Sequence, residues 1–164
     1  MSADDIRSVW MEQGGSATVR VEDVYDTDID DLWDAVSSPE RLARWIATVE
    51  GDAVLGGTIT ASFTSGWSGT GVVEECAPPH RLLVRWDDAP DALMAATLSA
   101  EGERTRLVIV DRGIPVDEVT GHTAGWHAHL EDLAAHLDGR QPGDWGARWE
   151  ELRPRYADLG PERL

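Results

Sequence analysis

The hydrophobic pattern of this chain changes its period between residues 112 and 119, and this change limits the folds available to it. Through residues 47–112 apolar and polar side chains alternate, so that within residues 58–64 Ile59 and Phe63 share one face of a strand. Through residues 119–137 the apolar residues instead recur about every 3.6 positions, as on an amphipathic helix. This order predicts a sheet followed by one long helix that covers one of its faces.

The alternating segments predict about seven strands in a largely antiparallel sheet, because most of them are joined by short turns. Gly56-Gly57 separates two of these segments and is typical of a two-residue hairpin. The predicted strands are residues 17–25, 47–55, 58–64, 69–76, 82–86, 92–100 and 105–113.

Two short helices are predicted between the first two strands, and one long helix near the end of the chain. Thr27 followed by Asp30 has the spacing of a capping box, and Pro39 suits the first position of a second short helix. The long helix is expected to end before Gly139. Its apolar stripe consists of Val119, Thr123, Trp126, Leu130, Leu133 and Leu137. The fold class is therefore α+β, with a curved sheet wrapped around this helix.

We expect one domain with two appendages. Residues 1–15 are predicted to be a polar extension, in which Ile6, Val9 and Trp10 form a docked helical turn, and residues 16–139 form the domain. Residues 140–164 are predicted to be a helical tail that packs on the domain or on a partner. In this tail Trp145, Trp149 and Leu152 follow helical spacing, and a homodimer formed through the two tryptophans is one alternative.

The composition excludes several classes of function. A formal net charge of −17 argues against nucleic acid and anionic membrane surfaces as partners. No segment approaches the roughly 20 apolar residues that cross a bilayer, and the acidic start does not resemble a signal peptide, so a cytoplasmic location is expected. All 14 basic residues are arginines, which excludes Schiff-base chemistry on lysine, and no cofactor motif is present.

Four segments resemble one known family when taken in order. They are "VYDTDIDDLWDAVSSPERLARWI", the Gly-Gly pair before "TITASF", "GTGVVEECAPPHRLLVRW" and "GHTAGWHAHLEDLAAHLDG", which together span about residues 17–139. This arrangement resembles the helix-grip fold of the START-like (SRPBCC) superfamily, in particular its bacterial branch related to the C-terminal domain of the activator of heat-shock protein 90 ATPase. The resemblance implies a cavity between sheet and helix that can hold an apolar small molecule.

Aromatic residues are the main candidates for the wall of such a cavity. The chain has eight tryptophans and one phenylalanine, and bulky rings beside small residues leave irregular space that suits apolar ligands. Ordinary filling of the core is the alternative for each ring. The predicted ligand-binding residues are Trp45, Phe63, Trp67, Trp86, Trp126 and Leu130.

No catalytic motif or metal site is predicted. His122, His129 and His136 follow one another at seven-residue spacing, about 10.5 Å along a helix, which is too far apart to share one ion. Helical pairing of His122 with Glu118 and of His136 with Asp132 is expected instead. Asp111 is the one weak catalytic candidate: it shares strand parity with inward residues and is either desolvated at the cavity mouth or solvated at a frayed strand end.

Three functions follow from these observations. The first is a protein without a recognisable catalytic motif that binds a small hydrophobic molecule. The second, implied by the resemblance, is a co-chaperone-like partner of a heat-shock ATPase in the stress response. The third is a cyclase-like or hydrolase-like enzyme that uses a polar residue such as Asp111.

Overall fold

Eight strands form a single antiparallel sheet in the computed structural model, which describes residues 6–51 and 54–162. Their order across the sheet is β1-β2-β8-β7-β6-β5-β4-β3, and every neighbouring pair is antiparallel. The strands are β1 (Arg7–Gln13), β2 (Ser16–Tyr25), β3 (Ala47–Gly51), β4 (Thr58–Phe63), β5 (Ser68–Ala77), β6 (Arg81–Trp86), β7 (Leu93–Glu101) and β8 (Arg104–Pro115).

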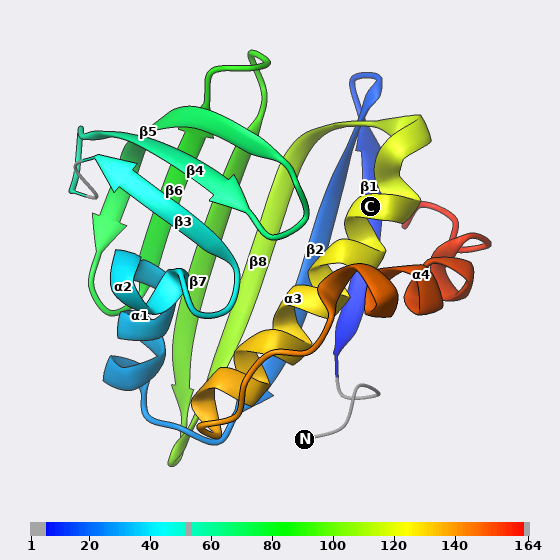
Figure 1. Ribbon diagram of the computed structural model, residues 1–164. Helices are drawn as coiled ribbons and strands as arrows, with labels where there is room; N and C mark the ends of the chain where they lie inside the picture. The colour runs from blue at the N-terminus through cyan, green and yellow to red at the C-terminus, as the bar shows by residue number, and fades with distance from the viewer. Residues whose placement is uncertain (1–5, 52–53, 163–164) are drawn as a thin grey trace.

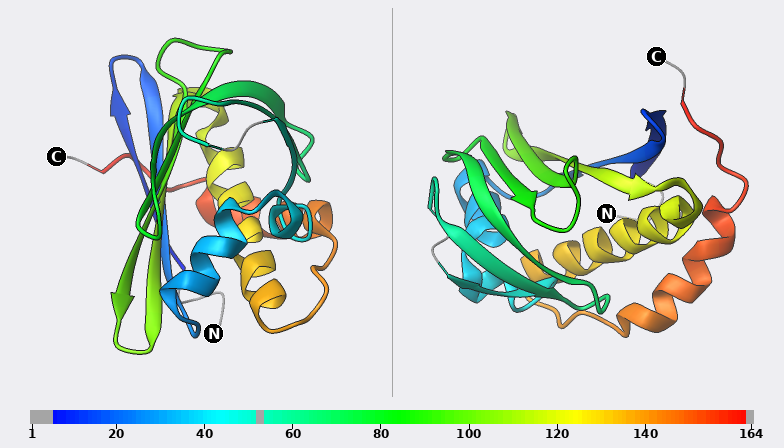
Figure 2. Two further views of the ribbon diagram at one scale, coloured as in Figure 1. Left: turned by 90° about the vertical axis from the view of Figure 1, so that its left-hand side faces the viewer. Right: turned by 90° about the horizontal axis from the view of Figure 1, so that it is seen from above.

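The two short helices and the long helix lie close to their predicted positions. The two short helices follow β2, and the long helix α3 follows β8 after a single 3₁₀ turn. The sheet curves around α3, while α4 packs on the side of α3 that faces away from the sheet (Figures 1 and 2). The predicted α+β helix-grip fold is confirmed. The helices are α1 (Ile29–Ser37), α2 (Pro39–Leu42), η2 (Val116–Glu118), α3 (Val119–Leu137) and α4 (Trp145–Tyr156).

Strand β1 replaces the helical turn that the sequence predicted near the start of the chain. Residues 7–13 pair with β2 over their whole length, from Arg7 opposite Glu22 to Gln13 opposite Ser16. Gly14 and Gly15 connect the two strands with φ angles of 62° and 86°. Positive φ at both central residues is what a tight two-residue hairpin requires, and glycine adopts it without strain.

The other Gly-Gly pair does not form the two-residue hairpin that was predicted for it. Strand β3 ends at Gly51 and β4 begins at Thr58, so the connection is longer, and residues 52–53 within it lie outside the described residues. Gly56 and Gly57 close the end of this loop instead, since the N–H of Gly56 donates to the carbonyl of Val73 at 2.8 Å. The predicted strand 47–55 was therefore too long.

The cap of α1 also differs by one residue from the prediction. Asp28, rather than Thr27, is the N-cap: its carboxylate accepts a hydrogen bond of 2.8 Å from the N–H of Asp31. The hydroxyl of Thr27 donates to the carboxylate of Asp31. Helix α2 begins at Pro39, where the missing N–H has no helical partner to lose, as predicted.

Helix α3 supplies one side of the main core. Its predicted stripe is confirmed, because Trp126, Leu130 and Leu133 are buried against β2, β8 and α1 with other core residues. Gly139 follows the helix with a φ of 75°, the usual conformation just after a helix end. None of the helices in the described residues is long and apolar enough to cross a membrane.

Helix α4 packs along α3 through complementary sizes. A Cβ added to Gly121 would lie 3.4 Å from the Trp149 ring, and one added to Gly125 would lie 3.3 Å from the Trp145 ring. The two glycines and the two tryptophans share a spacing of four, so two rings of α4 fill two gaps on one face of α3. Leu152 is fully buried behind them. The tail thus packs on the domain of its own chain.

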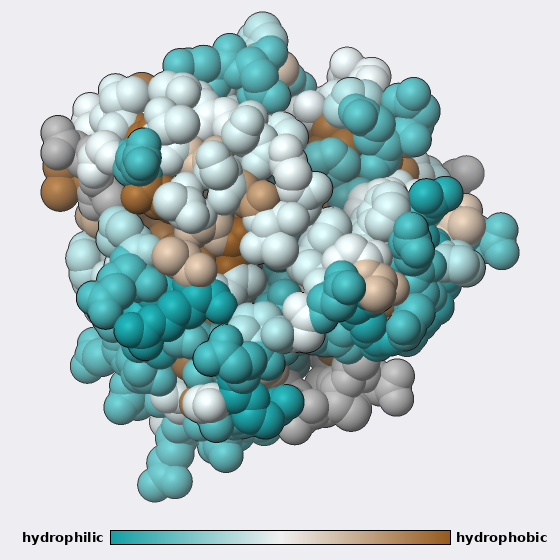
Figure 3. Space-filling model, viewed as in Figure 1, coloured by the Kyte–Doolittle hydropathy of each residue, from teal (hydrophilic) through white to brown (hydrophobic). Residues whose placement is uncertain are grey.

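The surface carries few large apolar groups. The view in Figure 3 is mostly teal and pale, with brown residues visible only in small areas. Among the described residues the large hydrophobic side chains that are exposed are Val54, Leu55 and Leu159.

Candidate functional site

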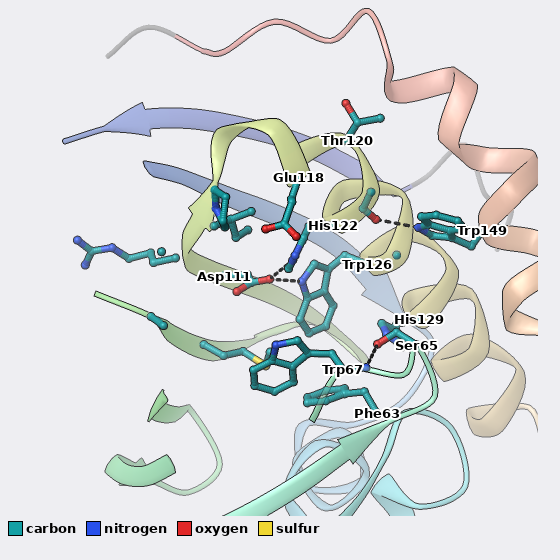
Figure 4. A pocket seen from close by; sticks show the side chains of 18 of the residues that line it. Phe63, Ser65, Trp67, Asp111, Glu118, Thr120, His122, Trp126, His129 and Trp149 are labelled. Carbon is teal, nitrogen blue, oxygen red and sulfur yellow. Dashed lines mark hydrogen bonds and ion pairs between the residues drawn. The ribbon is translucent and has the colours of Figure 1, made fainter. Parts of the chain in front are cut away.

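A pocket of about 1030 Å³ lies where α3 begins, between the sheet and α4. The loop from Phe63 to Trp67 and the ends of β6, β7 and β8 form one side of it. The first two-thirds of α3 and the tryptophans of α4 form the other side (Figure 4). The pocket therefore exists because α3 packs mainly on β1, β2 and β8, while the strands farther across the curved sheet stand off from it.

Aromatic rings make up the apolar wall of this pocket. Trp67 stands edge-on to Trp86 with ring centroids 4.9 Å apart, and Phe63 lies 5.4 Å from Trp67 and 6.3 Å from Trp86. Trp126 reaches the same space from α3 (Figure 4). Edge and tilted contacts leave ring faces uncovered, so the wall presents flat apolar surface to the pocket.

Four of the six predicted ligand-binding residues line the pocket, and two do not. Phe63, Trp67, Trp86 and Trp126 lie in its wall; their role in binding stays a prediction. Trp45 and Leu130 belong to the main core instead. The indole N–H of Trp45 donates to the carbonyl of Ala35 at 2.9 Å, and both Trp45 and Leu130 are buried by neighbouring side chains.

Asp111 lies inside the pocket and is not solvated at a frayed strand end. Its side chain is 12% exposed, and one carboxylate oxygen accepts hydrogen bonds from the Trp126 indole at 2.9 Å and from His122 Nδ1 at 3.3 Å (Figure 4). Strand β8 continues past it, and Gly113 forms a bulge there with a φ of 79°. A bulge next to a site turns the strand and sets the direction of nearby side chains.

His122 lines the pocket, and its hydrogen-bond partner is not the one that helical spacing predicted. It pairs with Asp111 across the pocket, and Glu118 acts on it only through its charge. Burial alone would lower the pKa of His122, but the hydrogen bond and charge of Asp111, with the charge of Glu118, outweigh burial and raise this pKa above its ordinary value. The pair therefore holds a proton on the pocket wall at pH values where an isolated histidine would lose it.

Changing Asp111 to asparagine is expected to lower the pKa of His122. Asparagine keeps an acceptor for the Trp126 indole but removes the charge that offsets burial. In the wild type the pKa of His122 is higher in the folded protein than in the unfolded chain, where it is about 6.5. Protonation of His122 therefore stabilises the fold fully below pH 6.5, and this contribution is lost as the pH rises through the pKa of the folded protein. NMR titration of the His122 ring measures the shift, and His136 is the internal control. An unchanged His122 pKa would contradict the assigned pair.

The remaining helical histidine pairing was predicted wrongly. His136 accepts a hydrogen bond of 3.1 Å from Arg41 Nε, and burial together with the charges of Arg41 and Arg44 lowers its pKa. No ion pair joins it to Asp132 in the part of the chain that the structure describes. Burial, with the charge of Glu131, raises the pKa of Asp132 to about 6. Three or more metal-ligating side chains do not gather anywhere in residues 6–51 and 54–162.

Two further pocket residues, Trp145 and His129, were not among the predicted ligand-binding residues. Trp145 comes from the tail, and His129 lies on α3 three residues after Trp126. The matching four-residue spacing of Gly121/Gly125 and Trp145/Trp149 is a sequence feature that could have placed the tail on α3. No comparable pattern identifies His129, because its neighbours come from β4 and α4.

Solved structures with the same fold include two proteins of bacterial origin. CalU16 from Micromonospora echinospora is 23% identical, with a TM-score of 0.77 over 94% of this chain and 97% of that chain. A protein of Bordetella parapertussis is 24% identical, with a TM-score of 0.70 over 93% of this chain and 90% of its own. At these identities the likeness shows the fold.

A third solved structure is more similar in sequence over a shorter region. DynU16, described as a putative protein in the dynemicin biosynthetic locus, is 30% identical with a TM-score of 0.69, over 77% of this chain and 50% of that chain. No curated protein matches the chain.

The family comparison agrees with the resemblance that the sequence segments indicated. Residues 26–138, well over half of the chain, match the family described as Activator of Hsp90 ATPase homolog 1-like protein. This range runs from the start of α1 to the end of α3, which includes most of the sheet and the first part of α3, where the pocket lies. The chain therefore belongs to the Activator of Hsp90 ATPase homolog 1-like family of the START-like superfamily.

Proposed function

We propose that this protein binds a small, largely apolar molecule that carries aromatic rings. The observation that supports this most is the pocket wall of Phe63, Trp67, Trp86 and Trp126. The volume of the pocket, about 1030 Å³, is at the upper end of the range for small-molecule sites, which is roughly 300–1,000 Å³. Uncovered ring faces favour a flat ligand, because offset stacking and edge contacts add to the gain from burying apolar area.

The charges around the pocket favour a ligand without negative charge. Asp88, Asp117 and Glu118 stand at its rim beside Asp111, against the cations of Arg112 and Arg153. The formal net charge of the whole chain, −17, adds repulsion of anions at long range. The solved relative DynU16, whose description places it in the dynemicin biosynthetic locus, is consistent with a role beside small-molecule chemistry.

The hydrocarbon fluorene, a flat three-ring compound, is a suitable probe for this proposal. We expect equilibrium dialysis to show saturable binding, and Trp67→Ala to weaken it by roughly tenfold, because the variant removes one aromatic wall from a partly exposed position in a loop. Trp33→Ala is the matched control, since Trp33 packs on the main core and does not line the pocket. Absence of binding, or an equal loss in both variants, would overturn the proposal.

A second function is favoured by the Asp111–His122 pair. A carboxylate that raises the pKa of a partly exposed histidine is an arrangement used for general acid–base catalysis, and here it faces the same pocket. A bound molecule could then undergo a proton transfer at His122. The hypothesis of a heat-shock ATPase partner rests on the family description alone and stays a prediction, as does a cytoplasmic location.

A further inference from the structure

Asp111 has one carboxylate oxygen that no protein group satisfies. Its Oδ2 accepts both hydrogen bonds of the site, one from the Trp126 indole and one from His122. Among the described residues no donor reaches Oδ1, and in Figure 4 this second oxygen lies on the side away from both partners. An ionised carboxylate accepts hydrogen bonds at both of its oxygens, so Oδ1 is left for a molecule in the pocket.

This second oxygen is accessible from the pocket. The side chain of Asp111 is 12% exposed, and the residue lines the pocket from the inner face of β8. The unpaired polar side-chain atoms that are fully closed off, in the part of the chain that the structure describes, belong to Ser8, His127, His129 and Trp145. Since Oδ1 of Asp111 is unpaired and is not among them, it keeps exposed surface that a ligand can contact.

The other charged groups of the pocket favour a cation at this oxygen. Three further carboxylates line the pocket, those of Asp88, Asp117 and Glu118. Of the two arginines that line it, Arg153 lies over the ring of Trp149, 5.1 Å from its centroid. In residues 6–51 and 54–162 neither arginine forms an ion pair with a carboxylate of the pocket. The resulting excess of negative charge attracts a positively charged group and repels an anion.

The proton on His122 competes with such a cation. The charged groups that act on His122 are Asp111 from β8 and Glu118 from η2, and both raise its pKa. A cation that pairs with Oδ1 offsets the charge of Asp111, so it weakens the attraction between Asp111 and the His122 proton. Binding of a cation and protonation of His122 should therefore oppose each other, which makes the histidine a reporter of what lies at Oδ1.

We propose that Asp111 binds, through its open oxygen, the ammonium group of a ligand that is otherwise aromatic. The ammonium donates a hydrogen bond to Oδ1, and the rings of the ligand lie against the aromatic wall of Phe63, Trp67, Trp86 and Trp126. This inference rests on the proposed function, because it specifies which aromatic ligands the pocket prefers. It gives Asp111 a role in selectivity that requires no reaction at His122.

The test uses three derivatives of fluorene that carry an aminomethyl, a hydroxymethyl or a carboxylate group at the same ring position. At neutral pH the amine is a cation, the alcohol is a neutral donor of nearly the same size, and the carboxylate is an anion. We expect the wild type to bind the amine about tenfold more tightly than the alcohol in equilibrium dialysis, because attraction between charges adds to the hydrogen bond that both can make. The carboxylate should bind more weakly than the alcohol.

Asp111→Asn removes the charge and keeps an acceptor for the Trp126 indole, so the ratio of amine to alcohol affinity should fall towards one. Because this ratio is formed within each variant, a general loss of stability cancels. Asp87→Asn is the matched control, since Asp87 is exposed beside Asp88 and is not among the residues that line the pocket. It removes the same charge nearby and should leave the ratio intact.

Equal affinities of the wild type for the amine and the alcohol would overturn the ammonium subsite and leave the proposed function standing. A ratio that stayed high in Asp111→Asn, or that was lost in Asp87→Asn, would also overturn the subsite, because the preference would then come from the overall charge. Failure of fluorene and all three derivatives to bind would overturn the subsite and the proposed function together.

NMR titration of His122 in the wild type tests the same inference without any variant. At saturation, the amine should lower the pKa of His122 further than the alcohol does. Both ligands exclude water from the pocket, but only the amine offsets the charge of Asp111 that raises this pKa. An equal pKa of His122 in the two complexes would show that the ammonium group does not lie at Asp111.

Discussion

Replacing Leu130 with alanine is expected to lower the free energy of unfolding by about 3 kcal/mol and to leave the affinity for fluorene unchanged. Leu130 is fully buried in the main core at the middle of α3, where the surrounding strands and α1 hold their positions and a cavity would remain. Its side chain does not line the pocket. Stability and binding should therefore separate at this residue.

Urea unfolding and equilibrium dialysis of the same samples measure the two quantities. Leu137→Ala is the matched control, because Leu137 is only partly buried at the end of α3 and should lose far less stability. A large loss of fluorene affinity in folded Leu130→Ala would mean that the pocket extends along α3 into the main core.

Leu130 also shows why the pocket could be predicted only in part. Its spacing from Trp126 places both residues on one stripe of α3, and periodicity reports which face of a helix is inward but not what lies opposite each turn. Leu130 lies in the main core, whereas Thr120, Gly121 and His122 at the start of α3 line the pocket. The division between core and pocket depends on sheet curvature, which no local pattern encodes.

Strand β1, at the edge of the sheet, was not predicted because its sequence also lacks a local pattern. In β1 only Trp10 is buried, so the strand lacks the alternating apolar residues that revealed its neighbours. The Trp10 indole donates to the carbonyl of Leu159, a partner at the opposite end of the chain. Of the two Gly-Gly pairs, the one next to β1 forms the tight hairpin, and the other closes a longer loop.

Asp111 was placed on the correct face by strand parity, but its partners came only from the structure. Leu107, Ile109 and Asp111 are all buried on one side of β8, as the alternation predicted. His122 and Trp126 reach Asp111 because β8 turns into α3 within a few residues, after the bulge at Gly113. Sequence spacing along α3 predicted Glu118 as the partner of His122, whereas in the structure His122 pairs with Asp111 on β8.

Replacing Leu152 with aspartate is expected to release α4 from α3 and to weaken fluorene binding by roughly tenfold. Leu152 is fully buried against Ala124 and Ala128, where a carboxylate would have no partner. Burying an unpaired charge costs on the order of 3–5 kcal/mol, so the helix should leave rather than hold it. Trp145 and Trp149 would leave the pocket wall with it.

The ion pair between Glu131 and Arg148 also holds α4 on α3, but it stabilises this contact by less than the free energy needed to bury an unpaired carboxylate. Arg148 holds both oxygens of Glu131 at 2.7 and 2.9 Å. Burial would raise the pKa of Glu131, yet hydrogen bonds and charges from His127 and Arg148 lower it to about 2. Because Arg148 and Glu131 are partly exposed, solvent screening reduces what the pair adds to stability.

Hydrogen exchange measures the outcome for α4 directly. In Leu152→Asp the amides of residues 145–156 should exchange much faster, while those of β7 and β8 stay protected. Ala147→Asp adds the same charge at an exposed position of α4 and should change neither exchange nor binding. Slow exchange throughout α4 in Leu152→Asp would show that the helix does not depend on this contact.

The last described residues of the chain cover part of the free side of β1. The N–H of Glu162 donates to the carbonyl of Trp10 at 2.7 Å, beside the bond from the Trp10 indole to Leu159. An outer strand with open backbone groups is a template for sheet-to-sheet association, and natural proteins guard against it by covering such strands. A second molecule could add a strand next to β1 only after displacing this segment. The segment therefore protects the edge of the sheet against intermolecular strand pairing and aggregation.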